Sequence, residues 1–208
     1  MKYKKLLWPT VIGLLPILMG LAVYSKLPEK MPIHWGLDGE PNGYATRLAG
    51  ILILPLIMVV VNVIVQFSLE TAPKTNFKLK KLMLWLLPIL SVIFQSLTLS
   101  EALGYHLDIA LITMVTVGII FILLGNYIPK TSQIRVAGFR FPMTLSNPDN
   151  WQKTNRLGGM MLVISGIIMI LGGVISTWYP IVAVLTFIVI LFLIILVPLC
   201  YSIRLARK

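Results

Sequence analysis

Charged residues are scarce in this sequence. Only 12% of the 208 residues are Asp, Glu, Lys or Arg, and 58% are hydrophobic, whereas about a quarter of the residues of a soluble domain are charged. A soluble globular protein is therefore excluded. Apolar runs of about 20 residues are long enough to cross ~30 Å of hydrocarbon as helices, so the sequence predicts an all-α membrane protein that crosses the bilayer several times.

Cysteine is almost absent as well. The single cysteine, Cys200, lies inside an apolar run, so no intramolecular disulfide is possible and a cysteine-based zinc site is not expected. The chain also lacks a G-x-x-x-x-G-K-[ST] phosphate loop and the H-E-x-x-H spacing of zinc hydrolases. We therefore expect no catalytic residues, no metal and no cofactor.

Six apolar windows are long enough to span a bilayer. They cover residues 6–24, 48–69, 82–99, 109–124, 157–176 and 181–203. The first follows a basic start, as in a signal peptide, but it is too long for an ordinary signal sequence and no A-x-A-like site follows it. We interpret it as an uncleaved first span, and we expect Asp108 to cap the fourth helix.

The distribution of Lys and Arg predicts the topology. With the N-terminus inside, three of the 18 basic residues (Lys26, Lys30 and Arg47) fall outside and the other 15 fall inside. Cytoplasmic loops carry such an excess, so we predict a six-transmembrane-helix bundle with both termini cytoplasmic. This bias also explains the net charge of +11 without a nucleic-acid partner. We divide the chain into an N-terminal three-span region, 1–107, and a C-terminal three-span region, 108–208.

The first region carries an extracytoplasmic loop, 25–47. Its prolines exclude a regular helix, its Asn-Gly and Asp-Gly pairs favour turns, and residues 31–35 could be extended. Its aromatic residues suggest a surface shaped for a partner. The candidate ligand-binding residues are His34, Trp35, Asp38, Glu40 and Tyr44. Two alternatives remain open: His34 could bond across its own loop, or the outer carboxylates and histidines, including Glu101, His106 and Asp108, could converge on a metal.

The second region carries a cytoplasmic loop, 125–159. Gly125 and Asn126 could end a helix in a left-handed conformation. Ser146 would cap a new helix, with Pro148 in its first turn and Asp149 reaching back to the cap. That helix would run into the fifth span with Trp151 at the membrane interface. Lys153 and Arg156 would then lie near lipid phosphates, or the positive charge of this loop could dock an acidic cytosolic surface.

This inner loop resembles the signature of the SdpI-like family of bacterial membrane proteins, which are named for immunity to a sporulation-delaying toxin. The matching segments begin with G-N-Y-I-P-K and end with G-G, and Met143 stands where a Trp is common in the family. The matching positions are Asn126, Pro129, Lys130, Gly138, Arg140, Thr144, Ser146, Trp151, Arg156, Gly158 and Gly159. The outer loop resembles an associated domain of unknown function, through its L-P, P-x-H-W and G-x-P-x-G elements.

The resemblance implies a non-enzymatic immunity protein of the bacterial plasma membrane. Its partners would be a secreted peptide toxin or bacteriocin on the outer face, membrane lipids, and in some family members a cytosolic repressor that responds to the toxin. Two other classes stay open: an envelope transporter or lipid-interacting protein, and a metal-dependent membrane enzyme. The transporter class would need polar residues within the membrane. Candidates are Asn62, Gln66 and Gln95, because intramembrane amides either join helices or line a pathway.

Overall fold

The computed structural model describes residues 4–36, 39–70, 77–131 and 137–207. Six helical segments in this part of the chain are long and apolar enough to cross a membrane, which confirms the six predicted spans. The described residues form two compact units, with the boundary between Leu107 and Asp108.

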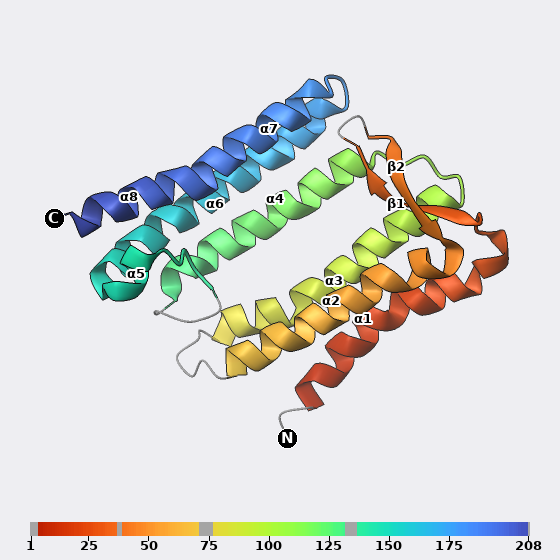
Figure 1. The fold of residues 1–208 in the computed structure, drawn as a ribbon, viewed down its shortest axis with the longest axis horizontal. Helices are drawn as coiled ribbons and strands as arrows, with labels where there is room; N and C mark the ends of the chain where they lie inside the picture. Colours follow the sequence, from red (N-terminus) through yellow and green to blue (C-terminus); the bar gives the residue numbers. More distant parts are fainter. Residues whose placement is uncertain (1–3, 37–38, 71–76, 132–136, 208) are drawn as a thin grey trace. The chain divides into compact units, whose positions relative to one another are not determined.

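The first unit is a three-helix bundle with a small hairpin at one end (Figure 1). Helices α1 (Lys4–Ala22), α2 (Arg47–Glu70) and α3 (Phe77–Ala102) each pack against the other two. Two buried hydrogen bonds join them: Gln95 Nε2 donates to the Gly50 carbonyl, and Ser91 Oγ donates to the Gly13 carbonyl, both at 2.8 Å. The interhelical role predicted for Gln95 is thereby confirmed.

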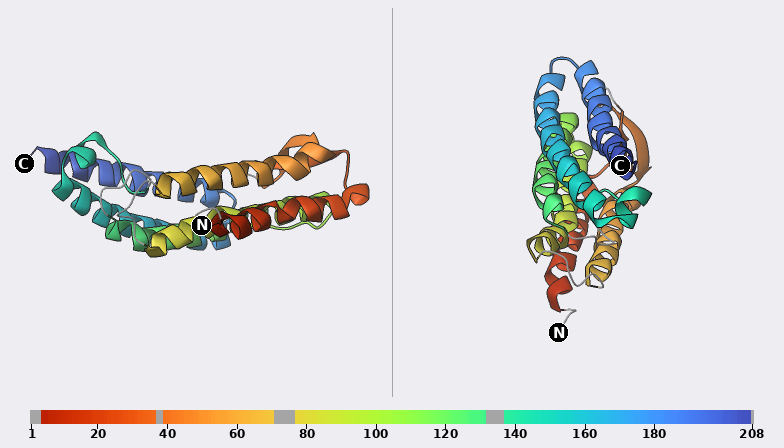
Figure 2. Two further views of the ribbon diagram at one scale, coloured as in Figure 1. Left: turned by 90° about the horizontal axis from the view of Figure 1, so that it is seen from below. Right: turned by 90° about the vertical axis from the view of Figure 1, so that its left-hand side faces the viewer.

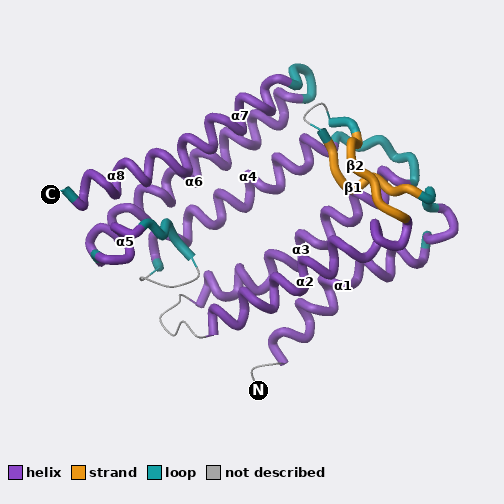
Figure 3. The backbone as a smooth tube through the Cα atoms, in the orientation of Figure 1, coloured by secondary structure: helices purple, strands orange, loops and turns teal. Residues whose placement is uncertain are grey.

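The hairpin follows a short 3-10 turn, Tyr24–Lys26, and consists of β1 (Lys30–Trp35) and β2 (Pro41–Thr46). The strands pair antiparallel, with a bulge next to Ile33. Figure 3 shows them as the strand segments at the end of the bundle away from the N-terminus. The extended segment predicted at 31–35 is confirmed, but the return strand was not foreseen. Met31 is fully buried against Leu27 and Ile51, so the hairpin is fastened to the helices below it.

The second unit is built around one long helix, α6 (Pro148–Ser176). On one side α6 packs against α4 (Ile109–Tyr127), and on the other against the sixth span. That span consists of α7 (Ile181–Leu191), a π-helical turn (Phe192–Leu196) and α8 (Val197–Ala206), which continue one another in Figure 2. A 3-10 turn, Ile128–Lys130, and a short helix, α5 (Pro142–Ser146), complete the unit.

Glycines allow α4 and α6 to approach closely. A Cβ on Gly118 would lie 2.7 Å from the Gly166 carbonyl oxygen, and a Cβ on Gly125 would lie 2.5 Å from that of Gly159. Small residues are typical of such close contacts between membrane helices. The prediction that Gly125 ends its helix in a left-handed conformation is wrong: α4 continues to Tyr127, and among the described glycines only Gly39, Gly104 and Gly138 have positive φ.

At the other end of this unit, Asp108 caps α4 as predicted. Its Oδ1 accepts from the Leu111 backbone N–H at 2.8 Å, and its Oδ2 accepts from the Thr177 hydroxyl at 3.2 Å. One carboxylate thus satisfies a free amide at the start of α4 and ties it to the end of α6.

Candidate functional site

The matching positions from Asn126 to Gly159 form what we call the inner motif, and one part of it is a small turn built around Thr144. This side chain is fully buried. Its hydroxyl accepts from the Phe141 backbone N–H at 2.9 Å and lies 2.8 Å from the Phe139 carbonyl oxygen, to which it can donate. The short helix α5 starts here because the hydroxyl satisfies backbone groups that an isolated turn would leave unpaired.

Asn155 fixes the preceding segment to α6. Its Oδ1 accepts from the Phe139 N–H at 2.8 Å, and its Nδ2 donates to the Trp151 carbonyl at 2.9 Å. Gly138, with φ of 119°, lets the backbone pass directly over this amide, since a Cβ there would lie 2.6 Å from Asn155 Oδ1. The Phe139 ring in turn occupies the space above Gly158, where a Cβ would come within 2.1 Å of it.

Trp151 belongs to this packed cluster. It is only 2% exposed, and its indole N–H donates to the Thr131 carbonyl at 3.3 Å. Trp151 therefore packs inside the protein, and its indole does not face lipid headgroups as an interfacial anchor would. An indole with a hydrogen-bond partner in the protein can be buried as a core residue, and the sequence does not distinguish that case from an interfacial one.

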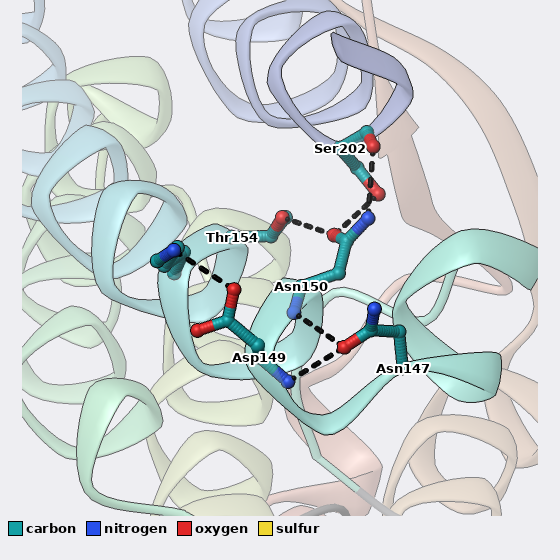
Figure 4. Close-up of polar contacts among 6 residues, drawn as sticks. Asn147, Asp149, Asn150, Thr154 and Ser202 are labelled. Carbon is teal, nitrogen blue, oxygen red and sulfur yellow. Dashed lines mark hydrogen bonds and ion pairs between the residues drawn. The ribbon is translucent and has the colours of Figure 1, made fainter. Parts of the chain in front are cut away.

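The start of α6 is capped by Asn147, as Figure 4 shows. The Asn147 side chain accepts from the backbone N–H groups of Asp149 at 2.9 Å and Asn150 at 3.3 Å. Ser146 instead ends α5, and its hydroxyl donates to the Met143 carbonyl. The predicted Ser146 cap is thus wrong by one residue, whereas Pro148 does lie in the first turn. Asp149 does not reach back to the cap; its carboxylate pairs with Lys153 at 2.8 Å.

Asn150 joins α6 to the last helix. Its Nδ2 donates to the Ser202 carbonyl, and its Oδ1 accepts from the hydroxyls of Ser202 and Thr154, all at 2.9 Å (Figure 4). All three side chains are at least 98% buried. This fully paired network holds the C-terminal helix against α6.

Four other motif residues face outward, whereas Pro129 is half-buried beside Gly159. Asn126, Lys130, Arg140 and Arg156 are exposed. Lys130 interacts locally, with Asn126 Oδ1 at 3.2 Å and with the Tyr127 ring. Neither Arg140 nor Arg156 forms an ion pair with any described residue. The motif therefore has a packed interior and two exposed arginines that take no part in this packing.

The outer candidates lie on or beside the hairpin. His34 Nδ1 pairs with Asn42 Oδ1 across the strands, which confirms that this histidine bonds within its own loop. Trp35 is half-buried, whereas Tyr44 is 56% exposed and Glu40 is exposed. Asp38 lies outside the described residues. The base of the hairpin is held by Arg47, whose Nε donates to the Pro28 carbonyl at 3.3 Å and whose guanidinium lies over the Tyr24 ring.

Two of the outer carboxylates that could have joined a metal site, Glu101 and Asp108, each have a partner within the protein. Glu101 lies 3.6 Å from His106 Nδ1, and Asp108 is engaged by Leu111 and Thr177. No group of three His, Cys, Asp or Glu residues suited to a metal occurs within the part of the chain that the structure describes.

Two features of the inner motif were not predicted from the sequence. No hydrogen-bonding role was predicted for Asn150 or Asn155, although two asparagines at the start of a span are a signal for hydrogen bonding in a membrane protein. The glycine spacing was also overlooked. Gly118 and Gly125 are seven residues apart, as are Gly159 and Gly166, and this spacing places each pair on one helix face.

The fold and the charge distribution define a multi-pass helical membrane protein. Residues 130–202 match the model of the SdpI/YfhL protein family, and residues 11–59 match a domain of unknown function, DUF1648. The chain is 31% identical over 166 residues to "Immunity protein SdpI" of Bacillus subtilis (strain 168), covering 80% of each protein. It is 38% identical over 56 residues to "Uncharacterized membrane protein YbgB" of the same organism, covering 27% of this chain and 59% of that protein. No solved structure matches.

The chain therefore belongs to the SdpI/YfhL family. It is a multi-pass protein of the bacterial plasma membrane.

Proposed function

We propose that this protein is an immunity protein that protects the cell against a secreted peptide toxin by binding it with the β1–β2 hairpin. The family relative that carries the name immunity protein supports this role. Capture of a peptide requires a binding surface and no reacting group, so we infer that the protein acts by binding and not by catalysis.

The observation that carries the proposal is an exposed aromatic residue on an anchored hairpin. Tyr44 is 56% exposed on β2 and Ile33 is 45% exposed on β1, while Met31 beneath them is fully buried in the bundle. Tyrosine is a frequent anchor of protein interfaces. An anchored strand also loses little conformational freedom on binding, so more of the contact energy contributes to affinity.

The hairpin also presents backbone groups and polar side chains. Within the described residues the sheet consists of β1 and β2, so each strand has one edge that does not pair with another strand. An extended peptide can add to such an edge through main-chain hydrogen bonds. Specificity along the peptide would then come from His34, Trp35, Glu40 and Tyr44. Asp38, outside the described residues, stays a candidate from the sequence alone.

We also propose that the inner motif reports toxin binding to a cytosolic partner such as a repressor. Its support is the pair of exposed arginines, Arg140 and Arg156, which have no ion-pair partner within the described residues. Arginine is suited to docking acidic surfaces because its guanidinium binds carboxylates in a bidentate manner.

The test is protection of a sensitive bacterium that expresses the protein and is challenged with a panel of membrane-active bacterial peptides. We expect Tyr44→Ala to lower protection at least tenfold, since truncating an anchor costs about 2 kcal/mol or more, while its abundance in the membrane stays normal. Alanine variants of His34 and Trp35 extend the test across the hairpin.

The matched control is Tyr105→Ala, because Tyr105 is 65% exposed in the loop after α3 and does not belong to the hairpin. Protection should be unchanged in this variant. If the wild-type protein protects against no peptide of the panel, or if the three hairpin variants protect fully at normal abundance, the hairpin is not a toxin receptor.

A further inference from the structure

A cavity of about 370 Å³ opens between the three helices of the first unit, at the end away from the hairpin. Residues from the beginning of α1, the end of α2 and the beginning of α3 line it. Its volume lies in the range of about 300–1,000 Å³ that is usual for small-molecule pockets. Because these helices are membrane spans, a cavity at their ends lies near the depth of lipid headgroups.

The rim of the cavity is basic. Lys5, Lys80 and Lys81 contribute three ammonium groups, and Glu70 contributes one carboxylate. None of these four residues forms an ion pair within 4.0 Å in the described part of the chain. Among the described residues that line the cavity, the rim therefore carries more positive than negative charge.

The rest of the lining is mostly apolar. Leu6, Leu69 and Leu84 contribute aliphatic surface, and Phe77 and Trp85 contribute aromatic surface. Gln66 also lines the cavity; it is 8% exposed, and its Nε2 has no hydrogen-bond partner among the described residues. A buried amide donor without a partner is costly, so a ligand oxygen placed beside Gln66 would relieve that cost.

The arrangement of these lysines is not explained by topology alone. The excess of positive charge in cytoplasmic loops accounts for the number of basic residues at this end of the bundle. It does not require that lysines from two helices converge on one cavity with an apolar wall. A ligand that matches both parts must carry a negative group and a long apolar group.

We propose that this cavity is a binding site for one anionic phospholipid, with the phosphate held by Lys5, Lys80 and Lys81 and the acyl chains along Trp85 and its apolar neighbours. Basic pockets between membrane helices are known to bind acidic lipid headgroups. Lys80 and Lys81 belong to α3 and Lys5 to α1, so the bound lipid would also join these two helices.

The first test compares lipids bound to the purified full-length protein by native mass spectrometry, after equilibration with phosphatidylglycerol or phosphatidylcholine. The wild-type protein should retain one phosphatidylglycerol preferentially. Each lysine near a membrane surface contributes about a fivefold change in affinity for acidic lipid, so the Lys5→Gln, Lys80→Gln, Lys81→Gln triple variant should lose the preference. The control variant, Lys153→Gln, Arg204→Gln, Arg207→Gln, removes the same number of positive charges from the second unit and should keep it.

The second test needs no charge variant and so does not depend on the triple variant folding. Trp85 lines the cavity and is one of five tryptophans. The protein is placed in phosphatidylcholine nanodiscs, and phosphatidylglycerol with brominated acyl chains is added. At a low mole fraction, this lipid should quench part of the tryptophan fluorescence. This component should be absent in Trp85→Phe and weaker at high salt. Glycerol 3-phosphate, which has the headgroup chemistry without the chains, should not compete.

Three results would overturn the proposal. The first is an equal preference for phosphatidylglycerol in the wild-type and the triple variant. The second is quenching by brominated phosphatidylcholine that equals quenching by brominated phosphatidylglycerol. The third is full competition by glycerol 3-phosphate, which would assign the cavity to a soluble phosphate compound instead of a lipid.

Discussion

Asn155 and Arg156 are neighbours in the sequence, and their side chains have different environments. The Asn155 amide is 1% exposed and bonded at both ends, to Phe139 and to Trp151. The Arg156 side chain is exposed and has no ion-pair partner among the described residues. Consecutive residues of a helix point about 100° apart, so packing accounts for Asn155 and leaves Arg156 available for a partner.

This contrast leads to a prediction for the double variant Arg140→Gln, Arg156→Gln. Exposed charges away from other features change stability by about 0.5 kcal/mol or less, so membrane abundance and toxin protection should persist. The transcriptional response of the cell to the toxin should be lost, because the proposed docking surface for a cytosolic partner has lost both arginines. A reporter gene driven by the responding promoter, measured beside immunoblots of the membrane fraction, gives both readouts.

Lys153→Gln is the control for the double variant. It removes an exposed positive charge from the same helix, but one that is already paired with Asp149, and the response should be retained. A fall in abundance of the double variant would show that the two arginines brace the fold. An unchanged response at normal abundance would show that they dock no signalling partner.

For single residues, the sequence predicted where a helix starts better than it predicted the role of each side chain. A helix start within Ser146–Asp149 could be predicted because this segment contains cap-forming residues and Pro148. Ser, Asn and Asp are similarly good caps, so the sequence did not decide between Ser146 and Asn147. Trp151 shows the same limit: its burial depends on the carbonyl of Thr131, which comes from a distant part of the chain.

At the scale of helices, the contact between α4 and α6 is the central contact of the second unit. Gly118 faces Gly166, and Gly125 faces Gly159, with backbone carbonyls in the space where Cβ atoms would lie. Lipid chains are as apolar as the helix surfaces, so the hydrophobic effect contributes little to holding helices together in a bilayer, and close van der Waals contact takes its place. The glycines are thus the residues that permit this packing.

Gly166→Ala should therefore destabilise the protein, although alanine is the better helix former. In a helix the change from Gly to Ala is favourable by about 1 kcal/mol. Here the new Cβ would lie 2.5 Å from the Gly118 carbonyl oxygen, and overpacking costs about 1–3 kcal/mol. Because the obstacle is backbone and cannot turn aside, we expect a lower thermal unfolding midpoint in detergent.

Ile167→Ala is the matched control, since Ile167 is the next residue of α6 and is 48% exposed. This change removes part of a half-exposed side chain and adds no atom to the contact between the helices, so the unfolding midpoint should move less than in Gly166→Ala. A higher midpoint in Gly166→Ala than in the wild-type protein would mean that the two helices do not pack as closely as the structure shows.

The helices themselves were predictable because hydrophobic length is the physical requirement for crossing a bilayer. All six spans were found, with ends that differ from the structure by several residues at α3 and α6. The five-residue helix α5 and the second strand were not found. Both depend on side chains that meet only after folding, such as Thr144 with the Phe139 carbonyl, and so have no periodic signal in the sequence.

At the scale of the whole molecule, the order of the spans separates the proposed sites between the two faces of the membrane. Each span reverses the direction of the chain, so the hairpin between the first two spans lies on one side. By the same alternation, we expect the inner motif, between the fourth and fifth spans, and the cavity between the ends of α1, α2 and α3 to face the other side of the membrane. Under the proposed function, this topology would let the protein bind the toxin outside and present the two arginines inside.

The distribution of basic residues predicts which side of the membrane is outside. Only 3 of the 18 basic residues lie on the hairpin side, so that side should be extracytoplasmic. In a Cys200→Ser background, which removes the only cysteine, Tyr105→Cys should react with a membrane-impermeant maleimide in intact cells. Arg140→Cys and Arg207→Cys should react only after the membrane is opened. All three positions are exposed, so a missing reaction reports the barrier and not burial. Labelling of Arg140→Cys in intact cells would reverse the topology, and with it the assignment of the hairpin as toxin receptor and of the arginines as a cytosolic surface.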